Sequence, residues 1–151
     1  MKQKGWMAMK KQLCLLLCGV ALMGVLTACG EEKISTKDVS LSDISGTLES
    51  YSKGSYTSQT IGDLKTEYDI DSGDVKQFSA RIKNGTCIVM VEAISDDAAN
   101  RIEGKLQDYV ARYNRTGTDQ VVKVGNYVAW FFGEGTQSQT MANTFSELVT
   151  A

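Results

Sequence analysis

The second half of the chain alternates apolar and polar residues in a way that predicts two β-hairpins. Apolar and polar residues alternate over residues 78–82, which are followed by Asn84-Gly85, a pair favoured in type I′ turns. On the return strand the alternating positions form two sets: Cys87, Val89, Val91 and Ala93, and Ile88, Met90, Glu92 and Ile94. A second pair of strands is expected at residues 121–124 and 127–132, joined by Gly125-Asn126, a type II′ pair. Each hairpin needs partners that bury its apolar face.

Apolar residues recur every three or four positions elsewhere, a spacing typical of amphipathic helices. The expected helices cover residues 41–51, 61–68, 96–113 and 137–148. Ser95 is expected to cap the third helix. The order α-α-ββ-α-ββ-α predicts an α+β fold, a two-layer sandwich whose antiparallel four-stranded sheet carries helices mainly on one face.

The N-terminal region has the layout of a secretory signal peptide over residues 1–28. A basic start at residues 9–12 precedes an apolar run, and the 16 residues from Leu13 to Ala28 fall short of the roughly 20 that a spanning helix needs. Translation from either Met1 or Met9 preserves this layout. An uncleaved membrane anchor and an ordinary secreted protein are the alternatives.

The apolar run ends in Leu26-Thr27-Ala28-Cys29, which resembles the lipobox of bacterial lipoproteins. The resemblance implies a diacylglyceryl group on Cys29 and cleavage between Ala28 and Cys29. Residues 29–40 are then a lipidated N-terminus with a polar spacer, and residues 41–151 a single extracytoplasmic domain. The expected location is the outer side of the cell membrane, with the lipid bilayer as partner and a further protein partner possible at the cell envelope.

Charge and residue usage narrow the chemistry of the domain. Four of the 16 basic residues precede Cys29, which leaves 12 basic against 18 acidic residues in the body, so nucleic acid is not an expected partner. The chain has no histidine, the commonest general base near neutral pH. Cys87 is the one cysteine left after processing and lipidation, and its β-branched surroundings predict a buried small hydrophobe.

Two groups of residues are candidates for binding. Asp69, Asp71 and Asp74 form the densest carboxylate group and a weak candidate for calcium, although they depart from the EF-hand template; the alternative is a turn stabilised by Asp side chains. Tyr127 and Phe131 share one face of an aromatic strand and are candidates for an exposed binding face; the alternative is that helices or a second copy cover both faces of the sheet.

The run Tyr68-Asp69-Ile70-Asp71, the two hairpins and Val124-Gly125-Asn126-Tyr127-Val128 resemble the small bacterial lipoproteins of domain of unknown function 4358. The resemblance covers most of residues 60–150 and carries no catalytic residue or ligand. It implies a lipoprotein of a family found mostly in Gram-positive bacteria.

The expected function is that of a membrane-anchored binding or accessory module, not an enzyme, with no cofactor and no catalytic residues. One alternative is an extracytoplasmic hydrolase that uses the carboxylates of Asp69, Asp71 and Asp74, with calcium. Another is a solute-binding accessory of a transporter, although 123 residues after cleavage are few for two lobes closing on a ligand.

Overall fold

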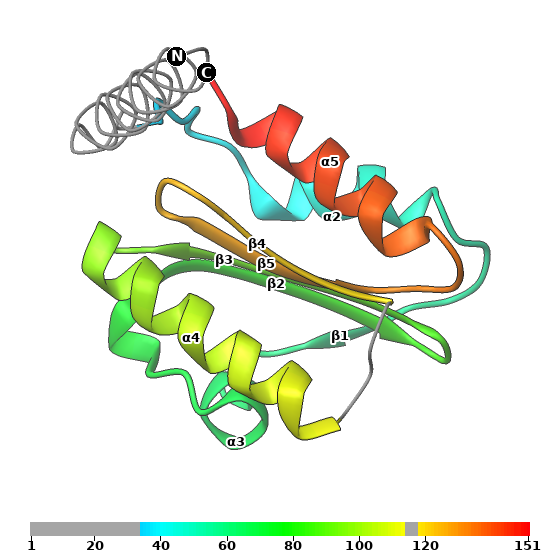
Figure 1. Cartoon of the computed structure of the whole chain (residues 1–151), viewed down its shortest axis with the longest axis horizontal. Helices are drawn as coiled ribbons and strands as arrows, with labels where there is room; N and C mark the ends of the chain where they lie inside the picture. Colours follow the sequence, from blue (N-terminus) through cyan, green and yellow to red (C-terminus); the bar gives the residue numbers. More distant parts are fainter. Residues whose placement is uncertain (1–33, 114–117) are drawn as a thin grey trace, which may run out of the picture. The chain divides into compact units, whose positions relative to one another are not determined.

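The computed structural model describes residues 34–113 and 118–151, and the chain from Ile34 to Ala151 forms one compact unit. Its described residues form an α+β fold with one antiparallel sheet and four α-helices, so the predicted fold class is confirmed at that level. The elements, in chain order, are α2 (Leu41–Glu49), β1 (Thr57–Gln59), α3 (Asp63–Tyr68), the 3₁₀ turn η1 (Ser72–Asp74), β2 (Val75–Lys83), β3 (Thr86–Ala93), α4 (Asp96–Tyr113), β4 (Asp119–Val124), β5 (Tyr127–Phe132) and α5 (Gln137–Val149) (Figure 1).

The sheet has five strands in the order β1-β2-β3-β5-β4. Both predicted hairpins are present, and β3 of the first pairs with β5 of the second, with Val89 opposite Trp130. The prediction of four strands is wrong because β1 adds an edge strand, with Thr57 opposite Ile82. This strand has only three residues, all polar, so it carries no apolar alternation that would predict it.

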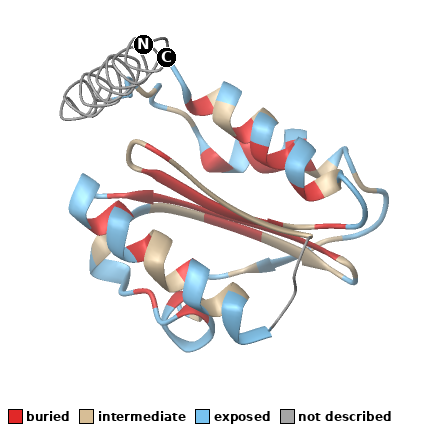
Figure 2. Ribbon diagram, in the orientation of Figure 1, coloured by how far each residue is buried: buried red, intermediate tan, exposed pale blue. Residues whose placement is uncertain are grey.

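Helices cover both faces of the sheet, so the prediction of two layers with helices mainly on one face is wrong. Figure 1 shows α2 and α5 on one face and α3 and α4 on the other. All eight residues of β3 are buried, as are the first five of β5, and these central strands are the red band of Figure 2. Two apolar faces require two covering layers, which gives an α/β/α arrangement.

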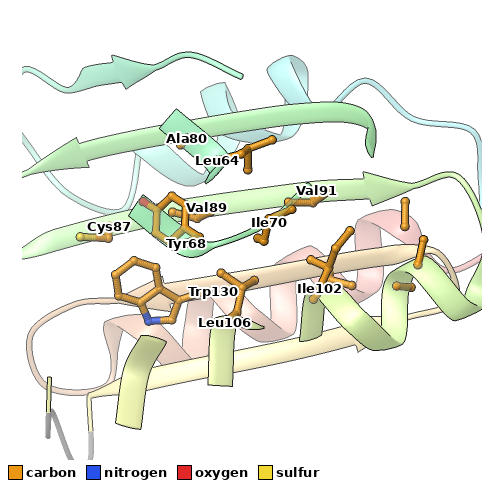
Figure 3. Packing of buried hydrophobic residues seen from close by; sticks show 14 residues of the cluster. Leu64, Tyr68, Ile70, Ala80, Cys87, Val89, Val91, Ile102, Leu106 and Trp130 are labelled. Carbon is orange, nitrogen blue, oxygen red and sulfur yellow. The ribbon is translucent and has the colours of Figure 1, made fainter. Parts of the chain in front are cut away.

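Each covering layer has its own core. The α4 core (Figure 3) contains Leu64, Tyr68, Ile70, Ala80, Cys87, Val89, Val91, Ala93, Ala98, Ala99, Ile102, Leu106, Val128 and Trp130. The α5 core contains Leu41, Ile44, Leu48, Ile88, Met90, Val124, Tyr127, Ala129, Phe131, Met141, Ala142, Phe145 and Val149. Trp130 and Phe131 are neighbours in the sequence and belong to opposite cores, since side chains alternate along a strand.

Local signals in the sequence account for several element ends. Ser95 accepts a hydrogen bond from the backbone N–H of Ala98, which confirms the predicted cap of α4. Gly125 has a φ of 55° and Asn126 is not in the positive-φ region, as a type II′ turn requires. In the first hairpin only Gly85 has positive φ, so the predicted type I′ turn, which needs two such residues, is wrong.

Residues 35–40, expected to be spacer, lie against the domain. The backbone N–H of Lys37 donates to the carbonyl of Val149 at 2.8 Å, and Thr36 forms an isolated bridge with Thr150. The hydroxyl of Tyr127 donates to the carbonyl of Lys37 at 2.9 Å and accepts from the N–H of Val39 at 3.3 Å. The folded unit therefore begins ahead of the predicted boundary at Leu41.

Candidate functional site

The loop after α3 brings together the three aspartates that the sequence singled out. Asp69 ends α3 in the left-handed conformation, with a φ of 56°. Aspartate is one of the few side chains that tolerate this conformation. Asp71 begins η1, and its carboxylate accepts a hydrogen bond from the N–H of Gly73 at 2.8 Å. Asp74 ends η1, directly before β2.

Cationic side chains from α3 and α4 bind two of these carboxylates. Lys65 donates to Asp69 at 2.6 Å, and Lys105 donates to the other oxygen of the same carboxylate. Arg101 binds Asp74 through two N–H groups, with N···O distances of 2.6 and 3.0 Å. A bidentate guanidinium–carboxylate pair is the strong form of this interaction. The loop is thereby tied to α4.

The ion pairs shift the acidities of both carboxyl groups. Hydrogen bonds from Lys105 and Lys65 lower the pKa of Asp69 to about 2. The hydrogen bond from Arg101 lowers the pKa of Asp74 below its ordinary value. Both groups are therefore held in their charged form at neutral pH, which does not suit a general acid.

These side chains surround a cleft of about 250 Å³, which we call the aspartate cleft; its lining is Lys65, Asp69, Ile70, Asp71, Asp74, Arg101, Ile102 and Lys105. Three cationic and three acidic side chains balance its charge. Calcium takes six to eight oxygen ligands, whereas the carboxylates of Asp69 and Asp74 already accept from cations. Within residues 34–113 and 118–151, no three His, Cys, Asp or Glu side chains are placed to hold a metal ion.

The predicted binding face at Tyr127 and Phe131 is wrong. Tyr127 is 2% exposed and Phe131 is fully buried, because α2 and α5 cover this face of the sheet. Phe131 packs edge-to-face on Phe145 of α5, with ring centroids 5.6 Å apart. Sequence alternation places the two residues on one face correctly, but does not tell whether that face is exposed.

A second, shallower hollow of about 400 Å³ lies where α5 begins and is lined by Tyr51, Glu134, Thr136, Gln137 and Thr140. Gln137 donates to the backbone carbonyl of Tyr51 at 2.9 Å, and the Tyr51 hydroxyl is 3.0 Å from that of Thr144. Tyr51 is 44% exposed. The helix expected over residues 41–51 ends at Glu49, so Tyr51 lies beyond it. The sequence carries no signal for this hollow, since its residues come from distant segments.

The sequence singles out three further residues, Ala28, Cys29 and Cys87. Ala28 and Cys29, the predicted cleavage and lipidation site, lie outside the described residues. Cys87 is buried in the α4 core, as its surroundings in the sequence predict. No helix in the described part of the chain combines the length and the apolar character needed to cross a membrane.

Comparison with known proteins adds no relative. No family model matches the chain, and neither a curated protein nor a solved structure matches it.

Proposed function

We propose that the protein is a bacterial lipoprotein, anchored through a diacylglyceryl group on Cys29 and displaying its α/β/α domain on the outer side of the cell membrane. The observation that carries the proposal is the segment Leu26-Thr27-Ala28-Cys29 directly after a basic start and a short apolar run. The resemblance of most of residues 60–150 to the lipoproteins of domain of unknown function 4358 supports the same assignment.

The physics of the attachment is that of lipid transfer out of water. Each buried methylene contributes about 0.8 kcal/mol, and stable anchoring needs two chains. A diacylglyceryl group has two chains. The acidic body of the protein has no basic patch in its sequence that would add a second, electrostatic attraction to an anionic bilayer.

For the domain itself we propose a binding or accessory role without catalysis. Two arrangements support this role. The carboxylates of the aspartate cleft are occupied by Lys65, Lys105 and Arg101. The buried Glu92 accepts from Lys76 and Gln77, each at 2.6 Å, and so serves to hold β2 against β3. The alternative of a calcium-dependent hydrolase is less favoured because its carboxylates are held by cations.

The anchor is tested by replacing its sulfur. Cells that express the intact chain, Cys29→Ser or Cys18→Ser are grown with labelled palmitate, and the N-terminal peptide is analysed by mass spectrometry. Cys18 is the matched control because it lies in the apolar run ahead of the proposed cleavage point. We expect labelled protein whose N-terminus is an acylated Cys29 from the intact chain and from Cys18→Ser, and loss of the label from Cys29→Ser. A peptide that retains Ala28, or an unmodified Cys29, would contradict the proposal.

A further inference from the structure

The first residues of the folded unit are fixed to one end of the domain. The N–H of Ala151 donates to the carbonyl of Ser35 at 3.0 Å, and Lys37 donates to Val149. Ile34 is therefore held beside the last turn of α5. A tether that arrives at Ile34 from Cys29 has to reach this end of the domain and no other.

Two turns show which parts of the sheet share this end. A methyl group added to Gly125 would lie 2.7 Å from Cγ2 of Thr36 and 3.6 Å from the carbonyl oxygen of Ile34. The carbonyl of Asn126 accepts from the N–H of Ala93 at 2.8 Å, so the residues after β3 lie here too. The Asn84–Gly85 turn lies at the opposite end, as Figure 1 shows for the β2–β3 hairpin.

Two large apolar side chains are exposed at the end that holds the tether. Ile34 is 53% exposed and Ile94 is 58% exposed. Both adjoin the Gly125–Asn126 turn, Ile34 through its carbonyl group and Ile94 as the residue after Ala93. They are two of the five large hydrophobic residues exposed in the described part of the chain. Exposing an apolar side chain to water costs free energy, whereas placing it against lipid does not.

The length of the tether limits how far this end can stand from the bilayer. Five peptide steps separate Cys29 from Ile34. A fully extended chain of that length spans at most about 18 Å. The nine residues of β2 alone cover about 30 Å along the long direction of the sheet. The tether is therefore shorter than the domain it holds.

From these observations we propose that the end of the domain formed by Ile34, Ile94 and the Gly125–Asn126 turn faces the lipid headgroups, and that the Asn84–Gly85 end points away from the membrane. This orientation rests on the proposed attachment at Cys29. It places the hollow lined by Glu134 and Gln137 at the outward end, because a methyl group on Gly85 would lie 3.7 Å from the carboxylate of Glu134.

The orientation is tested by energy transfer from a dye on the domain to the membrane. A donor dye is attached to Lys37→Cys or to Asn84→Cys in the lipidated protein, which begins at Cys29. Both positions are exposed and lie at opposite ends. The protein is reconstituted in phosphatidylethanolamine–phosphatidylglycerol vesicles that contain a rhodamine-headgroup lipid. The protein without an introduced cysteine measures the background, which is expected to be low because Cys87 is buried.

We expect transfer from position 37 to exceed transfer from position 84 by more than about twofold, because strand length separates the two dyes by about 30 Å along the domain. Inserting ten Gly and Ser residues after Lys33 should reduce this ratio, since a longer tether lets the domain turn. Equal transfer in a chain whose lipid on Cys29 is verified by mass spectrometry would overturn the orientation alone. A chain without lipid on Cys29 would overturn the attachment and, with it, the orientation.

Discussion

Asp69 has two structural roles: its backbone ends α3, and its carboxylate forms ion pairs with two lysines. Its left-handed conformation ends α3 and turns the chain toward β2. Its two carboxylate oxygens accept from Lys65 of the same helix and from Lys105 of α4. Asparagine tolerates the same backbone conformation. An Asp69→Asn substitution therefore removes the charge while the turn remains possible.

We expect Asp69→Asn to lower the stability of the domain at neutral pH but not in strong acid. The carboxyl of Asp69 has a pKa of about 2 in the folded state, against about 3.9 in an unfolded chain. A lowered pKa stabilises the folded state above the unfolded value, and this contribution is lost as the pH falls from about 4 toward 2. Urea unfolding of the two proteins at pH 7 and at pH 2 measures the effect.

Salt and a second substitution provide the controls for Asp69. Because the ion pairs are exposed, 1 M salt should shrink the difference between the two proteins at pH 7. Asp108→Asn removes an exposed acid of α4 and should change the urea midpoint little at either pH. A difference between Asp69→Asn and the unsubstituted protein that is as large at pH 2 as at pH 7 would show that the ion pairs are not its source.

Sequence proximity identifies the aspartates and one of their three cationic partners, but not the other two. Lys65 is four residues from Asp69, a spacing at which helix side chains meet. Arg101 and Lys105 are 27 and 36 residues from the carboxylates that they bind. Arg101 also lies four residues after Asp97, yet its guanidinium forms its bidentate pair with Asp74. Only the packing of α4 beside the loop determines that choice.

Periodicity predicts the elements better than it predicts their layers. The helices and both hairpins were expected because each has a repeating apolar pattern. In β3, however, the residues facing α4 and those facing α5 are both apolar, for example Val89 and Met90. Alternation of apolar and polar residues indicates that one face of a strand is exposed to solvent, and β3 has no solvent-exposed face. An uninterrupted apolar run is the signal for two covering layers, whereas the polar strand β1 leaves no such signal.

The contact between Thr36 in the N-terminal segment and Gly125 in the β4–β5 turn can be tested by substituting both residues. Gly125→Ala should destabilise the domain by about 2 kcal/mol, because alanine is strained at positive φ and overpacks its surroundings. Its φ is 55°, and the new methyl group would meet Thr36 at 2.7 Å. Adding Thr36→Ser removes the methyl group that is in contact and should restore part of the loss. Thermal and urea unfolding measure both steps.

Gly46→Ala is the matched control for that substitution. Gly46 lies within α2, its φ is not positive, and an added methyl group would meet nothing within 4 Å. We expect the change to stabilise the domain by about 0.5–1 kcal/mol, the helix preference of alanine over glycine. The opposite signs at Gly125 and Gly46 are the test; destabilisation of similar size at both positions would refute the proposed contact with Thr36.

At the scale of the whole domain, the two cores share their central strands. β3 and β5 each contribute alternate residues to the α4 core and to the α5 core. Removing either layer would expose one face of both strands to water. A small domain with shared strands unfolds as one cooperative unit. Loss of packing in one layer should therefore lower the stability of the other layer by the same amount.

Phe145→Ala tests this coupling across the sheet. Phe145 is fully buried in the α5 core, and its loss should cost about 3–5 kcal/mol. Trp130 is the one tryptophan of residues 29–151 and lies in the opposite core. If the layers unfold together, the substitution shifts the urea transition seen by Trp130 fluorescence as far as that seen by far-ultraviolet circular dichroism.

Glu147→Ala, an exposed change on the same helix, should change the unfolding free energy from either probe by no more than about 0.5 kcal/mol. A Trp130 transition that stays in place while the dichroism transition moves would mean that the layer of α5 unfolds on its own, since the substituted side chain touches only one of the two faces.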